Sequence, residues 1–184
     1  MERIRTVELA THHGERVRIA GWLHAIRRIG GLSFIVVRDG WGTAQVVVEG
    51  EAALASLGAA SAGPESIITV EGVVVPAPVA PDGCELREAH IDVLTSVTDV
   101  LPVTLGKREL KAQQTTLLDH AVVLNRHPAR RAILRLSAGI MRGFREALLE
   151  RQFTEIQTPK IGAAATEGGA NVFQLDYFGK PAYL

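Results

Sequence analysis

Residues 16–50, RVRIAGWLHAIRRIGGLSFIVVRDGWGTAQVVVEG, decide the fold because they contain three strand patterns separated by two turn signals. In the first pattern, RVRIAGWLH at 16–24, Val17, Ile19 and Leu23 occupy alternate positions. An alternation with a period of two residues predicts a strand with one buried face and one solvent-facing side. The stretch therefore begins with a half-buried strand.

The rest of the stretch predicts a meander of two further strands. We interpret AIRRIGG at 25–31 as the first turn, because its glycine pair can supply the positive φ angles that tight turns need. LSFIVVRD at 32–39 predicts the second strand, and the DGWG sequence at 39–42 is typical of a hairpin turn. TAQVVVEG at 43–50 predicts the third strand.

Residues 51–97 complete a small barrel. EAALASLGAASA at 51–62 predicts a short helix, which Gly58 weakens. SIITVEGVVV at 66–75 predicts a fourth strand, and CELREAHIDVLTSV at 84–97 predicts a bent fifth one after a proline-rich loop. Three strands, a helix and two strands follow one another in the order of an OB-fold, a small Greek-key barrel. Another small β-barrel, such as an SH3-like one, is the alternative, and the helix before the fourth strand favours the OB-fold.

The chain as a whole predicts an α+β protein with two domains. Residues 1–102 form the barrel domain. Residues 103–127 contain a polar, basic run without sustained periodicity, which predicts a hinge. Residues 128–184 then start a second domain.

The second domain is expected to open with a long helix. Pro128 occupies a first-turn position, where its missing N–H costs nothing, and apolar residues recur at helical spacing to about residue 152. FTEIQT at 153–158 predicts a strand that Pro159 stops, because proline cannot donate to a strand ladder. A loop of small residues with one carboxylate, Glu167, follows.

Composition and charge narrow the function classes. The 184 residues are 47% apolar, contain one cysteine and carry no net charge, so we expect a packed core, no disulfide and a cytoplasmic location. No apolar run is long enough for a membrane span, and no secretory signal is present. Residues 1–40 carry 7 basic against 4 acidic side chains, 41–105 carry 1 against 9, and 106–184 carry 12 against 7. Two basic ends fit contact with a polyanion, and a solvated helix face gives the same count.

The second and third strands supply the candidate binding residues. The corresponding face of an OB-fold binds single-stranded nucleic acid by stacking bases on aromatic rings and reading base edges. Phe34 and Gln45 suit one splayed base, and four arginines could hold phosphates: Arg16, Arg18, Arg27 and Arg28. Taken singly, each is better explained by an ordinary structural role: Phe34 as a core ring, Gln45 as an exposed amide and each arginine as a solvated surface charge. The scattered histidines predict no metal site, and no nucleophile or P-loop motif is present.

Three segments together resemble aspartyl-tRNA synthetases of the archaeal type, which also occurs in some bacteria. They are GWLHAIRRIGGLSFIVVRDGWGTAQVVV, RRAILRLSAGIMRGFREALLERQFTEIQTPKI and ATEGGANVFQLDYFGKPAYL, so the resemblance covers essentially the whole chain. The helix, strand and Thr-Pro unit is similar to motif 1 of class II synthetases, which implies that residues 128–184 start a catalytic domain built on an antiparallel sheet. Lysyl-tRNA synthetases share the order of barrel, hinge and motif 1, and the ATEGG loop argues against them.

The resemblance implies roles for individual residues. Phe34 matches the aromatic ring that stacks on the middle anticodon base, and Gln45 matches the amide that reads that uracil. Pro159 and the motif-1 helix match the homodimer interface. Glu167 matches the loop glutamate that contacts the α-ammonium group of the substrate L-aspartate.

Two further positions bear on which tRNA is accepted. His24 and Pro81 match positions near the third anticodon base, where enzymes restricted to tRNA(Asp) typically have tryptophan and lysine. The resemblance therefore implies a relaxed enzyme that also charges tRNA(Asn) with aspartate, with a functional link to an Asp-tRNA(Asn) amidotransferase. The sequence departs from the family in having Gln152 where a glycine often precedes the motif-1 strand.

The implied activity is an ATP-dependent aspartate–tRNA ligase that works through aspartyl-adenylate. Motifs 2 and 3, the ATP-contacting arginines and the Mg²⁺ ligands are expected beyond Leu184, so no catalytic residue is assigned within the 184 residues. An asparaginyl-tRNA synthetase and a non-catalytic OB-fold module that binds tRNA are the two alternatives.

Overall fold

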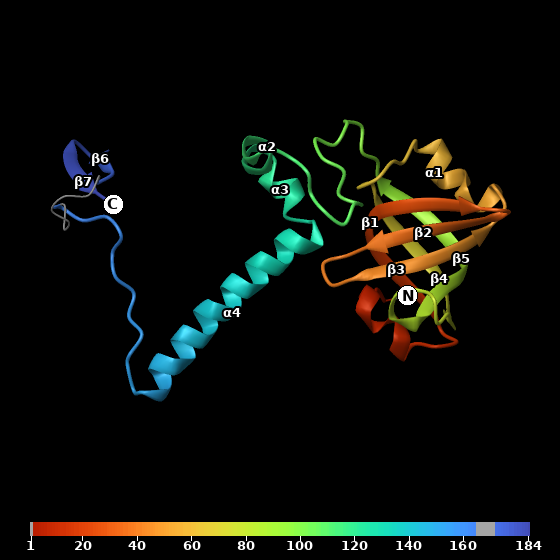
Figure 1. Cartoon of the computed structure of the whole chain (residues 1–184), viewed down its shortest axis with the longest axis horizontal. Helices are drawn as coiled ribbons and strands as arrows, with labels where there is room; N and C mark the ends of the chain where they lie inside the picture. Colours follow the sequence, from red (N-terminus) through yellow and green to blue (C-terminus); the bar gives the residue numbers. More distant parts are fainter. Residues whose placement is uncertain (1, 165–171) are drawn as a thin grey trace. The chain divides into compact units, whose positions relative to one another are not determined.

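A computed structural model describes residues 2–164 and 172–184 of the chain (Figure 1). The chain divides into two compact units, residues 1–133 and residues 134–184. The predicted domain limits, with a hinge at 103–127, remain a prediction.

The first unit is a five-stranded closed barrel in the strand order β1-β2-β3-β5-β4. β1 is long enough to pair with β4 through its first half and with β2 through its second half. β3 and β5 close the barrel through a short parallel pairing, in which Gln45 lies opposite Glu85 and Val46 opposite Leu86. The predicted OB-fold is confirmed. The strands are β1 (Arg16–Ile29), β2 (Leu32–Arg38), β3 (Thr43–Glu49), β4 (Ile67–Pro76) and β5 (Cys84–Thr95).

The first turn is shorter than the sequence predicted. We expected the chain to turn over 25–31, yet β1 continues to Ile29 and only Gly30 and Gly31 form the turn, Gly30 with φ +61°. The strand continues because β2 offers a ladder partner to each residue from Ala25 onward. A shift in the register between Leu23 and Ala25 places His24 at a β-bulge.

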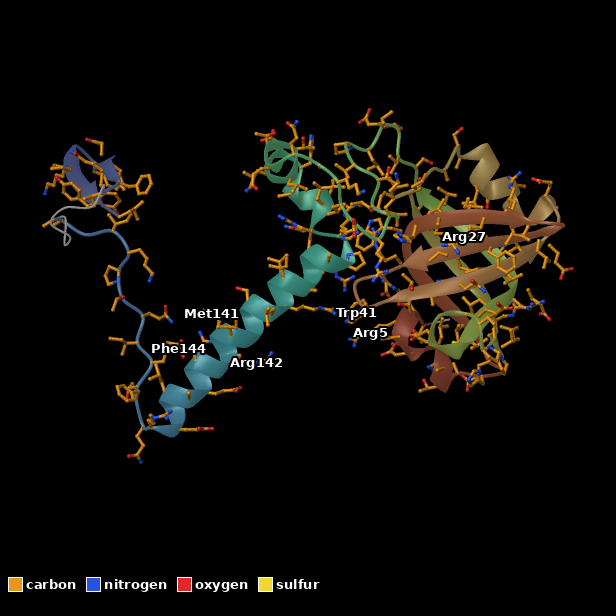
Figure 2. All side chains as sticks on the ribbon, in the orientation of Figure 1. Arg5, Arg27, Trp41, Met141, Arg142 and Phe144 are labelled. Atoms are coloured by element: carbon orange, nitrogen blue, oxygen red, sulfur yellow. The ribbon has the colours of Figure 1, made fainter. Side chains whose placement is uncertain are left out.

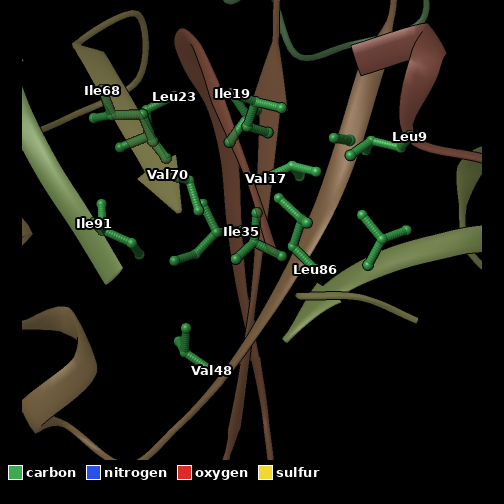
Figure 3. Packing of buried hydrophobic residues seen from close by; sticks show 14 of the residues in the cluster. Leu9, Val17, Ile19, Leu23, Ile35, Val48, Ile68, Val70, Leu86 and Ile91 are labelled. Carbon is green, nitrogen blue, oxygen red and sulfur yellow. The ribbon is translucent and has the colours of Figure 1, made fainter. Parts of the chain in front are cut away.

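Inward-facing aliphatic side chains fill the barrel (Figure 3). Ile19, Ile35, Val46, Ile68 and Val70 are each 0% exposed. Short helices close the barrel ends, and the helix predicted at 51–62 forms as two brief pieces. These elements are η1 (Thr6–Thr11), η2 (Ala52–Leu54), α1 (Ala55–Ala59) and η3 (Pro81–Gly83).

Gly21 lies where β1 leaves no room for a side chain beside the backbone of β2. A Cβ at this position would lie 2.3 Å from the Arg38 carbonyl oxygen, a backbone atom that cannot move aside alone. We predict that Gly21→Ala lowers the free energy of unfolding by about 1–3 kcal/mol, the usual cost of overpacking. Gly58→Ala is the matched control, because its Cβ would meet no atom within 4 Å and alanine favours the α1 helix. Urea denaturation of both variants measures the difference, and equal stabilities would contradict the close approach.

The segment predicted as an irregular hinge contains two short helices, α2 (Gln114–Asp119) and α3 (Ala121–Leu124). Two residues that follow these helices' starts are buried: Leu124 is 0% exposed and His127 is 2% exposed. The His127 ring donates from Nε2 to the Lys107 carbonyl oxygen (2.8 Å) and accepts from the Ala129 amide (3.2 Å). His127 thereby fixes the start of the next helix. Helices of six and four residues are too short to show periodicity in a sequence.

The helix α4 (Pro128–Glu150) forms as predicted, beginning in the first unit and continuing into the second. Its apolar stripe is exposed in this chain, and the exposed fractions are 62% for Ile133, 67% for Leu136, 63% for Ile140 and 64% for Phe144. No described helix is both long and apolar enough to cross a membrane.

The prediction of a strand at 153–158 was wrong, because these residues have no strand conformation in the structure. A strand needs a hydrogen-bonded neighbour, and no described residue pairs with this segment. Pro159 is exposed and follows a segment that has no strand conformation. The second unit instead contains a hairpin of β6 (Gln174–Tyr177) and β7 (Lys180–Tyr183), with an isolated bridge between Gly162 and Tyr183.

Candidate nucleic-acid interface

The register of β1, β2 and β3 brings three predicted binding residues onto the outer face of the barrel. Phe34 pairs with Arg27 on one side and with Val47 on the other. Gln45 lies opposite Val36, two residues along β2 from Phe34. Residues two apart in a strand point to the same face, and diagonal neighbours lie about 7–8 Å apart. Phe34, Gln45 and Arg27 therefore surround one small area.

Phe34 is a partly exposed ring and not a core phenylalanine. Its strand neighbour Ile35 is 0% exposed and faces inward, as does Val37. Phe34 falls at the alternate position and is intermediate in exposure. The ring is thus partly open to a ligand on the outer face of the barrel.

Gln45 is oriented by a buried carboxylate that sequence reasoning missed. The Gln45 Nε2 donates to Glu85 Oε2 (2.9 Å), and Arg87 Nε donates to Glu85 Oε1 (2.8 Å). Glu85 is only 5% exposed, so this contact is sheltered from solvent. The contact uses an amide N–H of Gln45, and the carbonyl oxygen is the group suited to accept from a base. The parallel β3–β5 pairing creates this contact, and no local sequence pattern reveals it.

His24 belongs to a buried charge network. Its Nδ1 accepts from Arg38 Nη1 (2.9 Å), because a guanidinium group can only donate. Arg38 Nη2 donates to both oxygens of Glu65, at 2.6 and 2.8 Å, and Arg126 Nη1 reaches the same carboxylate (3.2 Å). The Trp22 ring lies beside both guanidinium groups, 5.3 Å from Arg38 and 4.9 Å from Arg126.

This environment keeps the His24 ring neutral. Burial lowers the pKa of His24, and the nearby Arg38 guanidinium lowers it further. With Nδ1 accepting, the neutral ring has its proton on Nε2 and presents an N–H donor at that atom. His24 is therefore partly buried and hydrogen-bonded, and is not a freely solvated surface histidine.

The lowered pKa predicts that acid destabilises the barrel through His24. The unfolded ring takes up a proton as pH falls below about 6.5, whereas the folded ring resists protonation, so folding stability is lost in that direction. The free energy of unfolding falls by at most about 1.4 kcal/mol per pH unit, and solvent screening of the partly exposed ring reduces this value. Urea denaturation at pH 7.5 and 5.5 should show a smaller acid-induced loss for His24→Gln. An equal loss in both proteins would contradict the assignment.

The arginines near the face differ in their partners. Arg16 pairs with Glu88 (3.1 Å), Arg18 with Glu71 and Arg28 with Glu51 (3.4 Å). Arg27 is exposed beside Phe34, and within residues 2–164 and 172–184 no ion pair is recorded for it (Figure 2). Of the four arginines suggested by the sequence, Arg27 is the best placed to meet a phosphate.

The remaining predicted residues do not gather at this face. Pro81 lies in η3, the turn between β4 and β5. Glu167 lies outside the described residues. The described parts of the chain contain no group of three His, Cys, Asp or Glu side chains that could hold a metal ion.

Two family models match the chain in succession. The model described as "OB-fold nucleic acid binding domain" matches residues 17–94, and the model described as "tRNA synthetases class II (D, K and N)" matches residues 113–183. The first match coincides with the barrel, and the second begins just before α2.

Curated relatives agree with these matches. The chain is 41% identical over 184 residues to a protein of Deinococcus radiodurans named Aspartate--tRNA(Asp/Asn) ligase and 38% identical over 182 residues to one of the same name from Thermus thermophilus. The two alignments cover 100% and 99% of this chain, and 40% and 41% of the relatives. The chain thus spans about two fifths of the length of these relatives.

Solved structures show the same architecture. Asparaginyl-tRNA synthetase from Pyrococcus horikoshii, complexed with asparaginyl-adenylate, has a TM-score of 0.86 at 31% identity, covering 100% of this chain and 42% of that one. A putative aspartyl-tRNA synthetase from Leishmania major has a TM-score of 0.79 at 29% identity, covering 100% and 38%. The relatives and both family models confirm the resemblance stated from the sequence: the chain combines an OB-fold nucleic acid binding domain with a match to the class II tRNA synthetases, and its curated relatives are named as aspartate–tRNA ligases.

Proposed function

We propose that the protein to which this chain belongs attaches L-aspartate to tRNA(Asp) and also to tRNA(Asn), using ATP and forming aspartyl-adenylate. The observation that supports this most directly is the outer face of the barrel, where Phe34, Gln45 and Arg27 lie together. The names of the curated relatives support the amino acid and the two tRNAs. The cytoplasm is the proposed location, since this is where the tRNAs are charged.

The barrel face would read one unpaired pyrimidine of the anticodon. The Phe34 ring would stack on the base, and the Gln45 carbonyl oxygen would accept from the N3–H of uracil. Glu85 and Arg87 would hold the Gln45 amide in the orientation that leaves this oxygen outward. Cytosine lacks the N3–H donor, so the amide orientation gives the site a preference for uracil.

Relaxed choice of tRNA is proposed from His24 and Pro81. A tryptophan and a lysine at these two positions would add a large ring and a positive charge, and this chain has neither. The neutral His24 ring presents one N–H donor, and both cytosine and uracil have an O2 acceptor. A donor to an atom that both bases share would not separate the two tRNAs.

Aminoacylation of each tRNA by the complete protein tests this function. Four reactions combine tRNA(Asp) or tRNA(Asn) with labelled aspartate or asparagine, and we expect both tRNAs to accept aspartate and neither to accept asparagine. Charging of tRNA(Asp) alone would remove the relaxed specificity and the link to an amidotransferase. Charging of tRNA(Asn) with asparagine would favour an asparaginyl-tRNA synthetase, the candidate that the Pyrococcus horikoshii structure supports.

The amino acid and ATP sites are proposed to be completed by residues outside this chain, including the ligands of Mg²⁺. Glu167 is proposed to contact the aspartate α-ammonium group. Replacing Glu167 with alanine in the complete protein should raise the KM for aspartate in ATP–pyrophosphate exchange. An unchanged KM would refute this role.

A homodimer is proposed from α4. Met141 and Phe144 project from this helix (Figure 2) and are 58% and 64% exposed. Together with Pro159 they would be covered by the partner subunit. Phe144→Glu should shift the complete protein toward monomer in analytical ultracentrifugation, whereas Arg142→Glu, also on α4, is the matched charge-changing control.

A further inference from the structure

The turn between β2 and β3 presents an aromatic ring that the proposed function does not use. Trp41 is 46% exposed, and the Arg5 guanidinium lies 4.6 Å from the centre of its ring. Figure 2 shows the two side chains together at the edge of the barrel. Arg5 is itself more than half exposed, at 55% for its side chain. The pair therefore forms a small, solvent-facing platform of one indole and one cation.

The turn that carries Trp41 is held rigidly. The Asp39 carboxylate is only 1% exposed and accepts from the Thr6 amide (2.8 Å), the Thr6 hydroxyl (2.8 Å), the Trp41 amide (2.7 Å) and the Gly42 amide (2.8 Å). Burial alone would raise the pKa of Asp39, but these hydrogen bonds outweigh it and lower the pKa. The carboxylate thus remains charged and keeps the turn fixed against η1.

Two further contacts fix the same turn. Arg131 donates to the carbonyl oxygens of Asp39 and Gly40. Gly42 packs so tightly on η1 that a Cβ there would lie 2.8 Å from the Val7 side chain. An exposed aromatic ring on a rigid support loses little conformational entropy when a ligand stacks on it, which favours binding.

The position of the turn connects it with the RNA-binding face. Trp41 precedes Gln45 by four residues, about 13 Å at ~3.3 Å per residue of strand, so both can meet one hairpin loop. η3, which carries Pro81, lies against η1 at the same end of the barrel. The platform therefore lies at the end of the face where the third anticodon base is proposed to bind.

We propose that Trp41, with Arg5 stacked on it, is a second stacking position for an unpaired RNA base of the anticodon loop, beyond the position at Phe34. This inference rests on the proposed recognition of tRNA. Every base has a π-face, so an indole accepts any base without reading its edge. The Arg5 guanidinium strengthens the platform by its cation–π contact and is placed to meet the adjoining phosphate.

Binding of an anticodon stem–loop RNA to the complete protein tests the inference. We expect Trp41→Ala to weaken binding about tenfold and Trp41→Phe, which keeps an aromatic face, to weaken it less than threefold. Arg5→Gln should lower the slope of log affinity against log salt by about one. Leu94→Ala, which removes an exposed apolar side chain on β5 (61% exposed), is the matched control and should bind normally.

Further measurements distinguish failure of the second stacking position from failure of the proposed function. A set of stem–loops carries 2-aminopurine at one loop position each. At one position, the protein with Trp41 should quench the 2-aminopurine fluorescence and the Trp41→Ala variant should not. If Phe34→Ala weakens binding and Trp41→Ala does not, the second stacking position is overturned and the proposed function stands. If the protein does not bind the stem–loop, the proposed function fails as well. If Trp41→Ala equally weakens binding of a fully paired RNA, stacking of an unpaired base is refuted.

Discussion

Replacing Glu65 with glutamine is expected to lower the free energy of unfolding of this chain by about 3–5 kcal/mol. Glu65 and Arg38 have side chains only 2% and 1% exposed, and their ion pair is 2.6 Å long. Removing one charge of a buried pair leaves the other without compensation in a region of low dielectric constant. Glutamine keeps the shape of the side chain, so the expected loss comes from charge and not from volume.

Arg38 has few other hydrogen-bond partners that could compensate for loss of the Glu65 charge. Among the described residues, its Nε is the one buried side-chain nitrogen or oxygen with no hydrogen-bond partner. One of its other nitrogens donates to His24, and the remaining one donates only to Glu65. Loss of the Glu65 charge therefore leaves the guanidinium held by a neutral ring and a neutral amide.

Urea denaturation followed by tryptophan fluorescence is a suitable measurement, because Trp22 lies against both Arg38 and Arg126 and reports on the network. Glu51→Gln is the matched control. This change breaks the exposed ion pair between Glu51 (80% exposed) and Arg28 (61% exposed). It should lower the free energy of unfolding by less than about 1 kcal/mol. A loss for Glu65→Gln no larger than that of the control would show that the buried pair is not a stabilising contact.

A double variant distinguishes the cost of one unpaired buried charge from the cost of losing the whole ion pair. Replacing Arg38 with methionine and Glu65 with leucine removes both charges and keeps an apolar volume. Buried ion pairs replaced in this way are often neutral or stabilising. We expect the double variant to be more stable than Glu65→Gln alone. Glu65 also adopts a φ of +71°, and because each variant keeps a side chain there, this backbone strain is common to all of them.

The barrel was predictable because its strands are amphipathic at a period of two. Val17, Ile19 and Leu23 were assigned to the buried face and are at most 4% exposed. The extent of β1 was not predictable, since the residues from Ala25 to Ile29 are polar or mixed and become a strand only because β2 pairs with them. The motif-1 strand at 153–158 failed for the converse reason. Its local pattern is strand-like, but no described residue supplies the ladder partner.

The candidate site was predictable in part. Phe34, Gln45 and Arg27 lie on neighbouring strands in the sequence, so a simple meander already brings them together. Glu85 is distant in the sequence and reaches Gln45 only through the parallel pairing of β3 and β5. The Arg38–Glu65 pair shows the same limit. Arg38 looks like an ordinary charge at a strand end, and its burial depends on chain that folds over it from elsewhere.

Replacing Phe34 with alanine is expected to weaken binding of an anticodon stem–loop RNA by about 1–3 kcal/mol, or roughly 5- to 150-fold in Kd. The proposed role of the ring is to stack on one base, and its removal leaves the inward-facing Ile35 and Val37 untouched, so the barrel should stay folded. Circular dichroism and urea denaturation verify the fold of the variant. Isothermal titration with the stem–loop then measures the affinity at a fixed salt concentration, because phosphate contacts make affinity salt-dependent.

The amide at position 45 provides the matched comparison for Phe34. Gln45→Glu keeps the size of the side chain but replaces the N–H that reaches Glu85 with a second carboxylate, so it disturbs the reading of the base edge and leaves the stacking ring in place. We expect Phe34→Ala to weaken binding of stem–loops with any middle base, because stacking does not read base edges. Gln45→Glu should instead reduce the preference for uracil over cytosine at that base. If Phe34→Ala left the affinity for every stem–loop unchanged, the outer face of β1, β2 and β3 would not be where the anticodon binds.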